Sequence, residues 1–357
     1  MPGLAREEIE AVDTERHVDD VLAMPTHLED ALWRVASAGL DRTFAHLGDG
    51  LTNLLVCGMG GSAIGSDLAQ AALGDRLTKP MATVRGYELP PWATPSTVVV
   101  CSSYSGNTEE TIACYDAAGA LGAMRVAVTT GGQLGECARA DGVPVISPPA
   151  GLQPRAAIGY MMVSSLEIAT LAGAAQGVRT EIDAAAAGLQ RLAGAWGPDA
   201  DSDSLAKRVA QRVNGTCVCV YGAVPTTAVA TRWKTQLNEN AKVPAFAGEL
   251  PEADHNELVG WQHAAALGSF SAVFLQDPDQ HPRVRQRVEL TASLIEDQAA
   301  GTIALESIGS NPVERVLSLV LLGDLVSVYL AVLRGIDPTP VEPITRLKSA
   351  LAREEVA

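Results

Sequence analysis

The chain has 357 residues, of which 47% are hydrophobic, 19% are charged and only 4% are aromatic, and its formal net charge is -16. This length and composition predict a folded protein of about two domains and exclude a disordered chain. The negative charge argues against a nucleic-acid-binding protein, because affinity for the phosphate backbone comes mainly from a basic surface.

Three features bear on the compartment. The first twenty residues are charged and contain no apolar signal core, and the stretch nearest to a membrane span, residues 316–333, contains Asp324. A charge in such a stretch favours a buried helix. The one close pair of the six cysteines, Cys217 and Cys219, lies in an apolar run, so we expect buried thiols in a strand and not metal ligands. We therefore expect a cytoplasmic protein without a membrane partner.

The first half of the chain alternates between short apolar runs and alanine-rich segments. The first twenty residues or so predict an acidic helical lead-in. Five apolar runs then predict strands at 54–57, 81–85, 97–101, 125–129 and 143–146, the last at an edge because it contains Pro144. Helices are expected between them at 63–73 and 109–121. Strand–helix–strand at this spacing indicates a parallel, doubly wound sheet.

The pattern restarts in the second half. Strands are expected at 216–221, 271–275 and 302–306, and helices at 226–237, 282–298 and 312–333. The fold class is therefore predicted as α/β with two doubly wound parallel-sheet domains, joined through an alanine-rich helix in the region 172–197. We expect a lead-in over 1–24, a first domain over 25–172 and a second domain over 173–357 that ends in a C-terminal helix.

A glycine-rich loop, Gly58-Met-Gly-Gly-Ser-Ala-Ile-Gly65, joins the first predicted strand to a helix. Glycines let the backbone approach a ligand closely, and the N–H groups at a helix N-terminus attract anions. The same pattern fits a dinucleotide-binding fingerprint, with Arg85 in place to contact a 2′-phosphate. A tight turn without a ligand explains it equally well.

A second loop favours a third interpretation. The third predicted strand ends in Cys101-Ser-Ser-Tyr-Ser-Gly-Asn-Thr-Glu-Glu-Thr111, at the sheet edge where open α/β proteins bind ligands. Ser105 or Asn107 could simply cap the helix that follows, with Glu110 completing a capping box. A cap needs one hydroxyl, however, and the loop has four. A dinucleotide fold has no use for this loop, so the sequence favours a sugar phosphate.

The two loops together identify a family. GMGGSAIG and SSYSGNTEET closely resemble the phosphosugar-binding loops of sugar isomerase (SIS) domains, and the chain from Pro25 to Leu351 resembles the bifunctional phosphoglucose/phosphomannose isomerase family. The resemblance implies two SIS domains in one subunit and a homodimer whose subunits build the active sites together. It implies phosphate binding by Gly61, Ser62, Ser103, Ser105 and Thr108. The loop departs from the family in Ser66, where glycine often stands.

The resemblance also implies a catalytic base. Aldose–ketose isomerisation through a cis-enediol needs a base near C1 and C2 and donors for the charge on the sugar oxygens, and such donors make a metal unnecessary. The N-E-N-A-K motif of the family matches residues 238–242, which gives the role of base to Glu239. The flanking amides Asn238 and Asn240 could orient the carboxylate, and Lys242 could pair with it or cap the helix. Without the resemblance, Glu239 would be a solvated carboxylate at a helix end.

Three more positions match family motifs. His255, in an H-N-E motif, is implied to assist ring opening from the neighbouring subunit, and Lys348 is the implied catalytic lysine of the C-terminal helix. Arg155, after Leu152-Gln-Pro, is implied to stabilise the enediolate, since a guanidinium suits two adjacent oxygens. Each would otherwise be an ordinary loop or surface residue. The six histidines are dispersed, and neither a metal nor a cofactor is implied.

The expected function is therefore a metal-independent aldose–ketose isomerase that interconverts glucose 6-phosphate and/or mannose 6-phosphate with fructose 6-phosphate. A residue that governs tolerance of both C2 epimers cannot be matched, although Thr339, Val341 and Thr345 lie near the relevant place. The alternatives are a non-catalytic sugar-phosphate sensor, an isomerase of another sugar phosphate and a dinucleotide-dependent oxidoreductase. A sensor has no reason to keep the four catalytic matches together, and no basic DNA-binding domain is visible.

Overall fold

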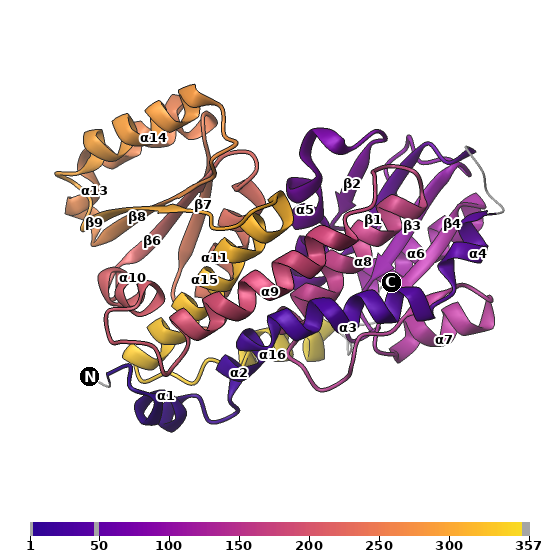
Figure 1. The fold of residues 1–357 in the computed structure, drawn as a ribbon, viewed down its shortest axis with the longest axis horizontal. Coiled ribbons are helices and arrows are strands. Elements are labelled where there is room, and N and C mark those ends of the chain that lie inside the picture. Colours follow the sequence, from indigo (N-terminus) through magenta and orange to yellow (C-terminus); the bar gives the residue numbers. More distant parts are fainter. Residues whose placement is uncertain (1–2, 46–49, 352–357) are drawn as a thin grey trace.

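The computed structural model describes residues 3–45 and 50–351. It contains two parallel sheets with helices on both faces, which confirms the predicted α/β fold (Figure 1). The first sheet has the strand order β2-β1-β3-β4-β5 and the second has the order β7-β6-β8-β9. The strands are β1 (Asn53–Gly58), β2 (Met81–Val84), β3 (Thr97–Ser102), β4 (Met124–Val128), β5 (Val145–Ile146), β6 (Cys217–Gly222), β7 (Ala245–Glu249), β8 (Phe270–Gln276) and β9 (Gly301–Glu306).

Alternate residues of the first sheet pack on opposite faces. Leu54 and Val56 of β1 belong to the core that includes α5 (Gly60–Leu73) and α8 (Ile158–Leu171). Leu55 and Cys57 pack with residues of α6 (Glu109–Leu121) and α7 (Gly132–Ala140). Burial on both faces explains why these strands read as continuous apolar runs in the sequence. β5 lies at the edge of the sheet, as Pro144 predicts.

The second sheet is covered in the same way. Its inner face packs against α10 (Leu205–Val213), α11 (Thr227–Glu239) and α15 (Pro312–Leu333), and its outer face is covered by α14 (Pro282–Ile295) and the short segments between β7 and β8. Those segments are η4 (Glu252–His255), α12 (Glu257–Gly260), η5 (Trp261–His263) and α13 (Ala264–Leu267). The edge strand β7 was not predicted.

The cysteines of β6 differ from the prediction. All six cysteines are free thiols, but Cys217 and Cys219 are half-buried, not buried. They lie on the same face of β6, and Cys219 lines an open apolar pocket there. The prediction of buried thiols was wrong because the pocket leaves this face of β6 partly open.

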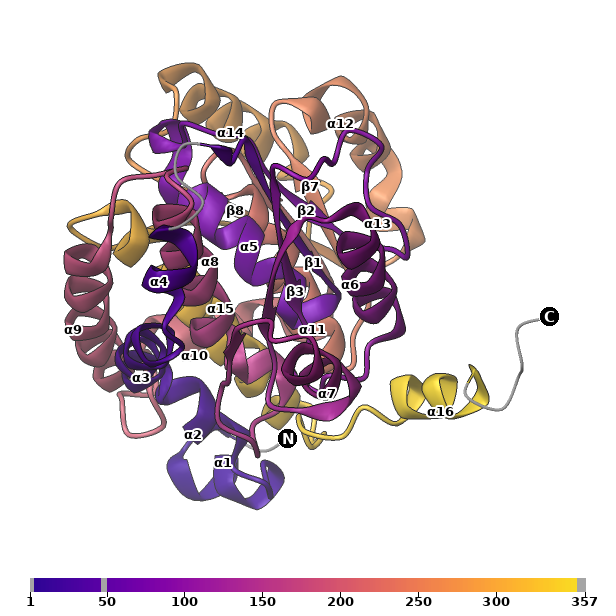
Figure 2. The same cartoon turned by 90° about the vertical axis from the view of Figure 1, so that its right-hand side faces the viewer.

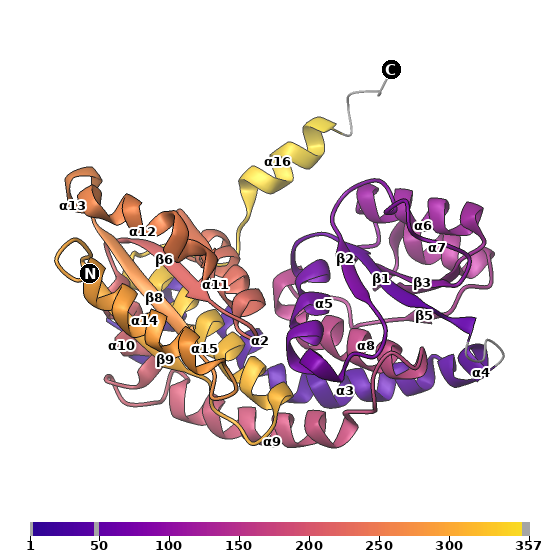
Figure 3. The ribbon, with the colours of Figure 1, turned by 90° about the horizontal axis from the view of Figure 1, so that it is seen from above.

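Helices between the two sheets form one continuous apolar core. The lead-in is helical as predicted, with α1 (Arg6–Val12) and α2 (His17–Leu22), and it continues into α3 (Met24–Ser37) and α4 (Leu40–Ala45). The alanine-rich segment at the predicted junction is α9 (Arg179–Trp196), which packs against α3 and α15 and runs alongside both sheets (Figure 3). The domain boundaries at residues 24 and 172 stay predictions.

The central helix α15 carries a charge in its apolar sequence. It is long and apolar enough to cross a membrane, but the whole of its apolar window is buried inside the protein, as predicted for residues 316–333. Asp324 on this helix forms an ion pair with Arg232 of α11, at 2.6 Å between Oδ2 and Nη2. Both side chains are buried, so the pair joins two helices of the core.

The described part of the chain ends in α16 (Glu342–Leu351), which projects from the body of the protein (Figure 2). All its residues are exposed. It is reached through residues 337–341. Thr14 of the lead-in anchors this segment by donating a hydrogen bond to Asp337, at 2.8 Å from Oγ1 to Oδ2.

Candidate active site

The strand order of the first sheet places the two predicted loops side by side. β1 lies between β2 and β3, and the chain leaves β1 for α5 on one face and β3 for α6 on the other. The carboxyl ends of two such strands form a switch point, where open α/β sheets bind ligands. The loops touch there, since a Cβ on Gly58 would come within 2.7 Å of the Ser102 carbonyl oxygen. The Tyr104 N–H also donates to Ser62 Oγ, at 3.2 Å.

A cavity of about 410 Å³ opens at this switch point. Its volume suits a small ligand. Seven of the nine predicted site residues line it: Gly61, Ser62, Ser105, Thr108, Arg155, Glu239 and Lys348. The structure thus brings together residues from the first sheet, from α11 and from α16. Ser103 and His255 do not line it.

The helix that starts at the second loop has no side-chain cap. Thr108 is the N-cap residue of α6, and its hydroxyl contacts Ser103 Oγ at 2.8 Å and not a backbone N–H of the helix. Asn107 Oδ1 accepts from the N–H of Gln133 in α7. Ser105 Oγ accepts from the N–H of Asn107. The capping alternative is therefore not realised, and the N-terminus of α6 is left to attract an anion at the cavity wall.

Ser103 is a buried residue that stabilises the second loop through hydrogen bonds. Its Oγ accepts a hydrogen bond from the Gly106 N–H at 3.1 Å in addition to its contact with Thr108. The expectation that Ser103 contacts the phosphate stays a prediction. Its hydroxyl fixes Thr108, which does line the cavity.

Arg155 enters the cavity from η3 (Pro154–Ala157), which packs closely on the first loop. A Cβ on Gly61 would lie 2.9 Å from the Pro154 carbonyl oxygen, so only glycine permits this approach. The Arg155 side chain is 3% exposed, and burial lowers its pKa from the usual value. Its Nε donates to Asn240 Oδ1 at 2.6 Å, and its Nη2 donates to the carbonyl oxygens of Pro338 and Thr339. Three fixed acceptors hold the guanidinium in one orientation.

Glu239 is the last residue of α11, and its carboxylate faces that guanidinium. Oε2 lies 3.7 Å from Arg155 Nη1, and the side chain is 30% exposed. The neighbouring amides do not hold the carboxylate as expected: Asn240 binds Arg155 and Ser327, and Asn238 accepts from the N–H of Ala245. Arg155 is therefore the group that faces Glu239.

Lys242 caps the helix that carries Glu239. Its Nζ donates to the backbone oxygen of Glu239 at 2.6 Å and to that of Pro338 at 2.8 Å, which is one of the two roles expected for it. Burial and the nearby Arg155 lower the pKa of Lys242 to about 8. Lys242 and Arg155 thus share Pro338 as an acceptor and tie the end of α11 to the segment that leads into α16.

Lys348 reaches the cavity from α16 and is exposed. Val341 and Ile344 line the cavity beside it. Val341 is the one position among the three considered for C2-epimer tolerance that lies at the cavity wall. Sequence reasoning missed Gln153, which also lines the cavity, and Tyr104, whose hydroxyl accepts from the Leu152 N–H at 2.9 Å and braces the approach to Arg155.

His255 lies elsewhere. It is exposed in η4, on the outer side of the second sheet, and the cavity of the same chain does not include it. One chain therefore brings together the predicted base, arginine and lysine, but not the predicted histidine.

The corresponding loops of the second sheet are joined by hydrogen bonds, and a pocket of about 350 Å³ lies beside Val224, Pro225 and Thr227. Thr226 Oγ1 donates to the Leu275 carbonyl oxygen at 2.8 Å, and Gln280 Nε2 donates to Ala223 O at 2.9 Å and to Thr226 Oγ1 at 3.2 Å. These contacts join the loop after β6 to the loop after β8.

Similarity to known proteins extends over most of the chain. Residues 202–351 match the family described as "Bacterial phospho-glucose isomerase C-terminal SIS domain". A bifunctional phosphoglucose/phosphomannose isomerase from Caldicellulosiruptor bescii is 40% identical over 305 residues, which cover 85% of this chain and 90% of that protein. One from Aquifex aeolicus is 36% identical over 304 residues, 84% of this chain and 90% of that protein. A solved structure of a hypothetical protein from Thermus thermophilus has the same fold, with a TM-score of 0.75 at 18% identity, over 98% of this chain and 92% of that chain.

Proposed function

The chain belongs to the bifunctional phosphoglucose/phosphomannose isomerase family, and on that premise we propose that it interconverts glucose 6-phosphate and mannose 6-phosphate with fructose 6-phosphate. The observation that carries the proposal is the single cavity that joins the two predicted phosphate loops to Glu239, Arg155 and Lys348. We extend the proposal to a cytoplasmic homodimer.

In the proposed mechanism, different residues of the cavity bind the phosphate, transfer the proton and stabilise the enediolate. The phosphate binds between Ser62, Ser105 and Thr108, where the N-terminus of α6 and the hydroxyls compensate for the negative charge of the whole chain. With the phosphate at this end, C1 and C2 of the open sugar lie toward Glu239. The carboxylate removes the proton from one carbon and returns it to the other. Arg155, facing Glu239 at 3.7 Å, stabilises the charge on the enediolate oxygens.

Ring opening is assigned to Lys348 and to His255 of a second copy. The two ring nitrogens of an imidazole can donate and accept protons, so His255 can move the proton of the ring oxygen. His255 is exposed and outside the cavity of its own chain, so a second copy is needed to supply it. A non-catalytic sensor would need the two loops but not the carboxylate, guanidinium and ammonium groups that face each other across the same cavity.

The proposal is tested by a coupled assay of the purified protein with fructose 6-phosphate in the presence of a chelator. We expect both glucose 6-phosphate and mannose 6-phosphate to form, monitored separately. Formation of one product would restrict the substrate, and Val341 would be the first residue to exchange. Binding of fructose 6-phosphate without either product would favour the sensor or a different sugar.

The phosphate assignment predicts a binding defect. Thr108→Ala removes a hydroxyl at the α6 N-terminus, and loss of a hydrogen bond to a charged group should raise KM roughly 10- to 100-fold while kcat changes little. Steady-state kinetics with fructose 6-phosphate measure both. Thr227→Ala is the control, because Thr227 is the threonine that follows the N-cap of α11, the helix after the first strand of the second sheet. A fall in kcat alone in the Thr108 variant would remove the loop from the phosphate site.

Sharing of the site between two copies predicts complementation. Glu239→Gln and His255→Ala proteins are each expected to be nearly inactive, but a refolded equimolar mixture should recover about a quarter of wild-type turnover, since half the dimers are hybrids with one intact site. A mixture of Glu239→Gln with Lys348→Ala should recover nothing, because both residues line the cavity of the same chain. Equal results for the two mixtures would contradict the assignment of His255 to the second copy.

A further inference from the structure

Two apolar surfaces of the chain have no partner among the described residues. The first is a stripe on α16. Ile344, Leu347 and Leu351 follow helical spacing and share one face, and they are 41%, 61% and 48% exposed. Figures 2 and 3 both show the helix standing away from the body. A ten-residue helix is marginal in water unless its apolar face is packed, so this exposed stripe needs a surface to cover it.

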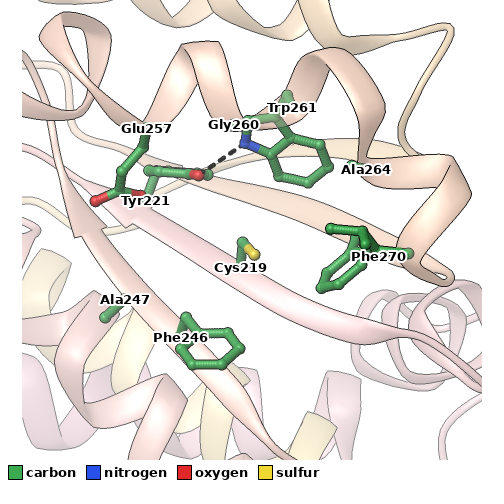
Figure 4. A pocket seen from close by; sticks show the side chains of 10 residues that line it. Cys219, Tyr221, Phe246, Ala247, Glu257, Gly260, Trp261, Ala264 and Phe270 are labelled. Carbon is green, nitrogen blue, oxygen red and sulfur yellow. Dashed lines mark hydrogen bonds between the residues drawn. The ribbon is translucent and has the colours of Figure 1, made fainter.

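The second surface is an apolar pocket of about 400 Å³ on the outer side of the second sheet. Figure 4 shows the rings of Phe246, Trp261 and Phe270 around its opening and the sulfur of Cys219 between them. Trp261 Nε1 donates to Tyr221 Oη at 3.0 Å, which holds the indole in place. Leu267 at the rim is 82% exposed. A preformed apolar pocket with such a rim is typical of a protein–protein contact.

The pocket is connected to the candidate active site. A trough of about 670 Å³ lies between them, and it shares Phe246 with the pocket and Glu239, Val341 and Ile344 with the active-site cavity. The pocket also includes Glu257, two residues after His255. The active-site cavity, the trough and the pocket therefore form one continuous depression. It begins beneath α16 and ends beside His255, which the proposed function assigns to a second copy.

We propose that the two surfaces are the two halves of one symmetric contact, in which the Leu347–Leu351 end of α16 of one copy occupies the apolar pocket of the other. The inference rests on the proposed dimeric isomerase. In a two-fold dimer a contact between two different surfaces is made twice, so both stripes and both pockets are covered. The two surfaces have opposite charges. The charged residues of α16 are Arg346, Lys348 and Glu342, which give it a net positive charge. Glu257 is the one charged residue that lines the pocket, and it is negative.

The contact has a consequence for the site. Lys348 follows Leu347 and lies four residues after Ile344, so it borders the stripe and faces the cavity of its own chain. Docking of the stripe fixes the helix that carries Lys348. The same contact brings the second copy's η4, with His255, toward that cavity. One interface thus assembles both groups that the proposed mechanism assigns to ring opening.

Cysteine cross-linking tests the contact directly. Leu347→Cys and Leu267→Cys proteins are mixed, oxidised mildly and digested, and mass spectrometry identifies the joined peptides. We expect an interchain disulfide from position 347 to position 267 or to the native Cys219 of the pocket. Ser349→Cys lies on the opposite face of α16 and should give less than roughly a tenth of that product. A matched pair of charge variants, Leu347→Glu and Ser349→Glu, should weaken dimerisation in sedimentation experiments only in the first case.

The outcomes separate this contact from the proposed function. A disulfide within one chain of the Leu347→Cys/Leu267→Cys double variant, with no interchain product, would show that α16 folds back on its own chain and would overturn the proposal. A dimer without the cross-link, or a monomer, would overturn it as well. The wild-type assay with fructose 6-phosphate is read independently. An active dimer without the cross-link would refute the contact alone, and a cross-linked inactive dimer would refute the isomerase function alone.

Discussion

The Glu239→Gln variant is expected to lose about 10²- to 10⁴-fold in kcat with little change in KM. Glutamine keeps the shape of the side chain at the end of α11 but cannot accept the substrate proton. The proposed phosphate contacts come from loops of the first sheet, at the other wall of the cavity, and the exchange leaves them in place. Steady-state kinetics give kcat and KM, and incorporation of deuterium from heavy water at C2 of the sugar reports the proton transfer itself, which should disappear.

Glu110→Gln provides the comparison, because Glu110 and Glu239 are the two carboxylates that line this cavity. Glu110 lies in the first turn of α6, beside the proposed phosphate end. Its exchange should leave deuterium incorporation in place and change kcat less than about tenfold. Loss of exchange in the Glu110 variant with retention in the Glu239 variant would transfer the role of base to Glu110.

The sheets could be predicted from the sequence because most of their strands are buried on both faces. β1 and β3 are almost wholly buried and read as unbroken apolar runs. β7 escaped prediction because its apolar run, Ala245-Phe246-Ala247, is only three residues long, and only Ala245 of its five residues is buried. As an edge strand beside an open pocket, it has no second partner to require such a pattern.

The sequence could predict which residues form the candidate site but not which hydrogen bonds hold their side chains. The motifs pointed to Glu239 and Arg155, and the cavity brings them together. The interpretation that Asn240 orients the carboxylate was wrong, because this amide binds the Arg155 Nε across 85 residues of sequence. Such a contact depends on how the end of α11 packs against η3, and no local pattern encodes that packing.

His17 shows the same limit in the lead-in. The sequence around it is charged and indicates an exposed helix, but the structure buries the side chain almost completely. Burial, together with the nearby Arg155 and Arg232, lowers the pKa of His17 to about 3. The imidazole is therefore neutral at physiological pH and adds no positive charge behind the arginines. The sequence missed this burial because α15, which packs against α2, lies near the other end of the chain.

Stability should depend strongly on the ion pair between Asp324 and Arg232. The two side chains are 2% and 1% exposed, and the guanidinium donates from Nε to Oδ1 at 3.0 Å and from Nη2 to Oδ2 at 2.6 Å. Asp324→Asn leaves a buried guanidinium without a compensating charge, which should lower the free energy of unfolding by about 3–5 kcal/mol. Urea unfolding followed by circular dichroism measures the loss. Glu306→Gln, which breaks the exposed pair with Arg285, should cost less than about 1 kcal/mol.

The two single exchanges of this pair should differ in their response to pH. Arg232→Met leaves a buried carboxylate whose pKa burial already raises. In that variant the folded pKa lies above the unfolded one, so the stability it contributes is present at low pH and is lost as the pH rises. The Arg232→Met protein should therefore lose less stability at about pH 5 than at about pH 8. The loss of stability in Asp324→Asn should not depend on pH in this way, because a buried guanidinium does not lose its charge by deprotonation. Equal losses at both pH values would contradict a charged Asp324.

The same pair should affect catalysis through the backbone of Arg155. Arg232 Nη2 also donates to the Arg155 carbonyl oxygen, at 2.9 Å. The double variant Arg232→Met/Asp324→Leu replaces the pair by apolar groups and should regain most of the stability lost in Asp324→Asn. It still lacks the hydrogen bond to Arg155, so kcat should remain reduced while the urea midpoint recovers. Recovery of both quantities together would show that the pair only joins α11 to α15 and does not position the arginine that faces Glu239.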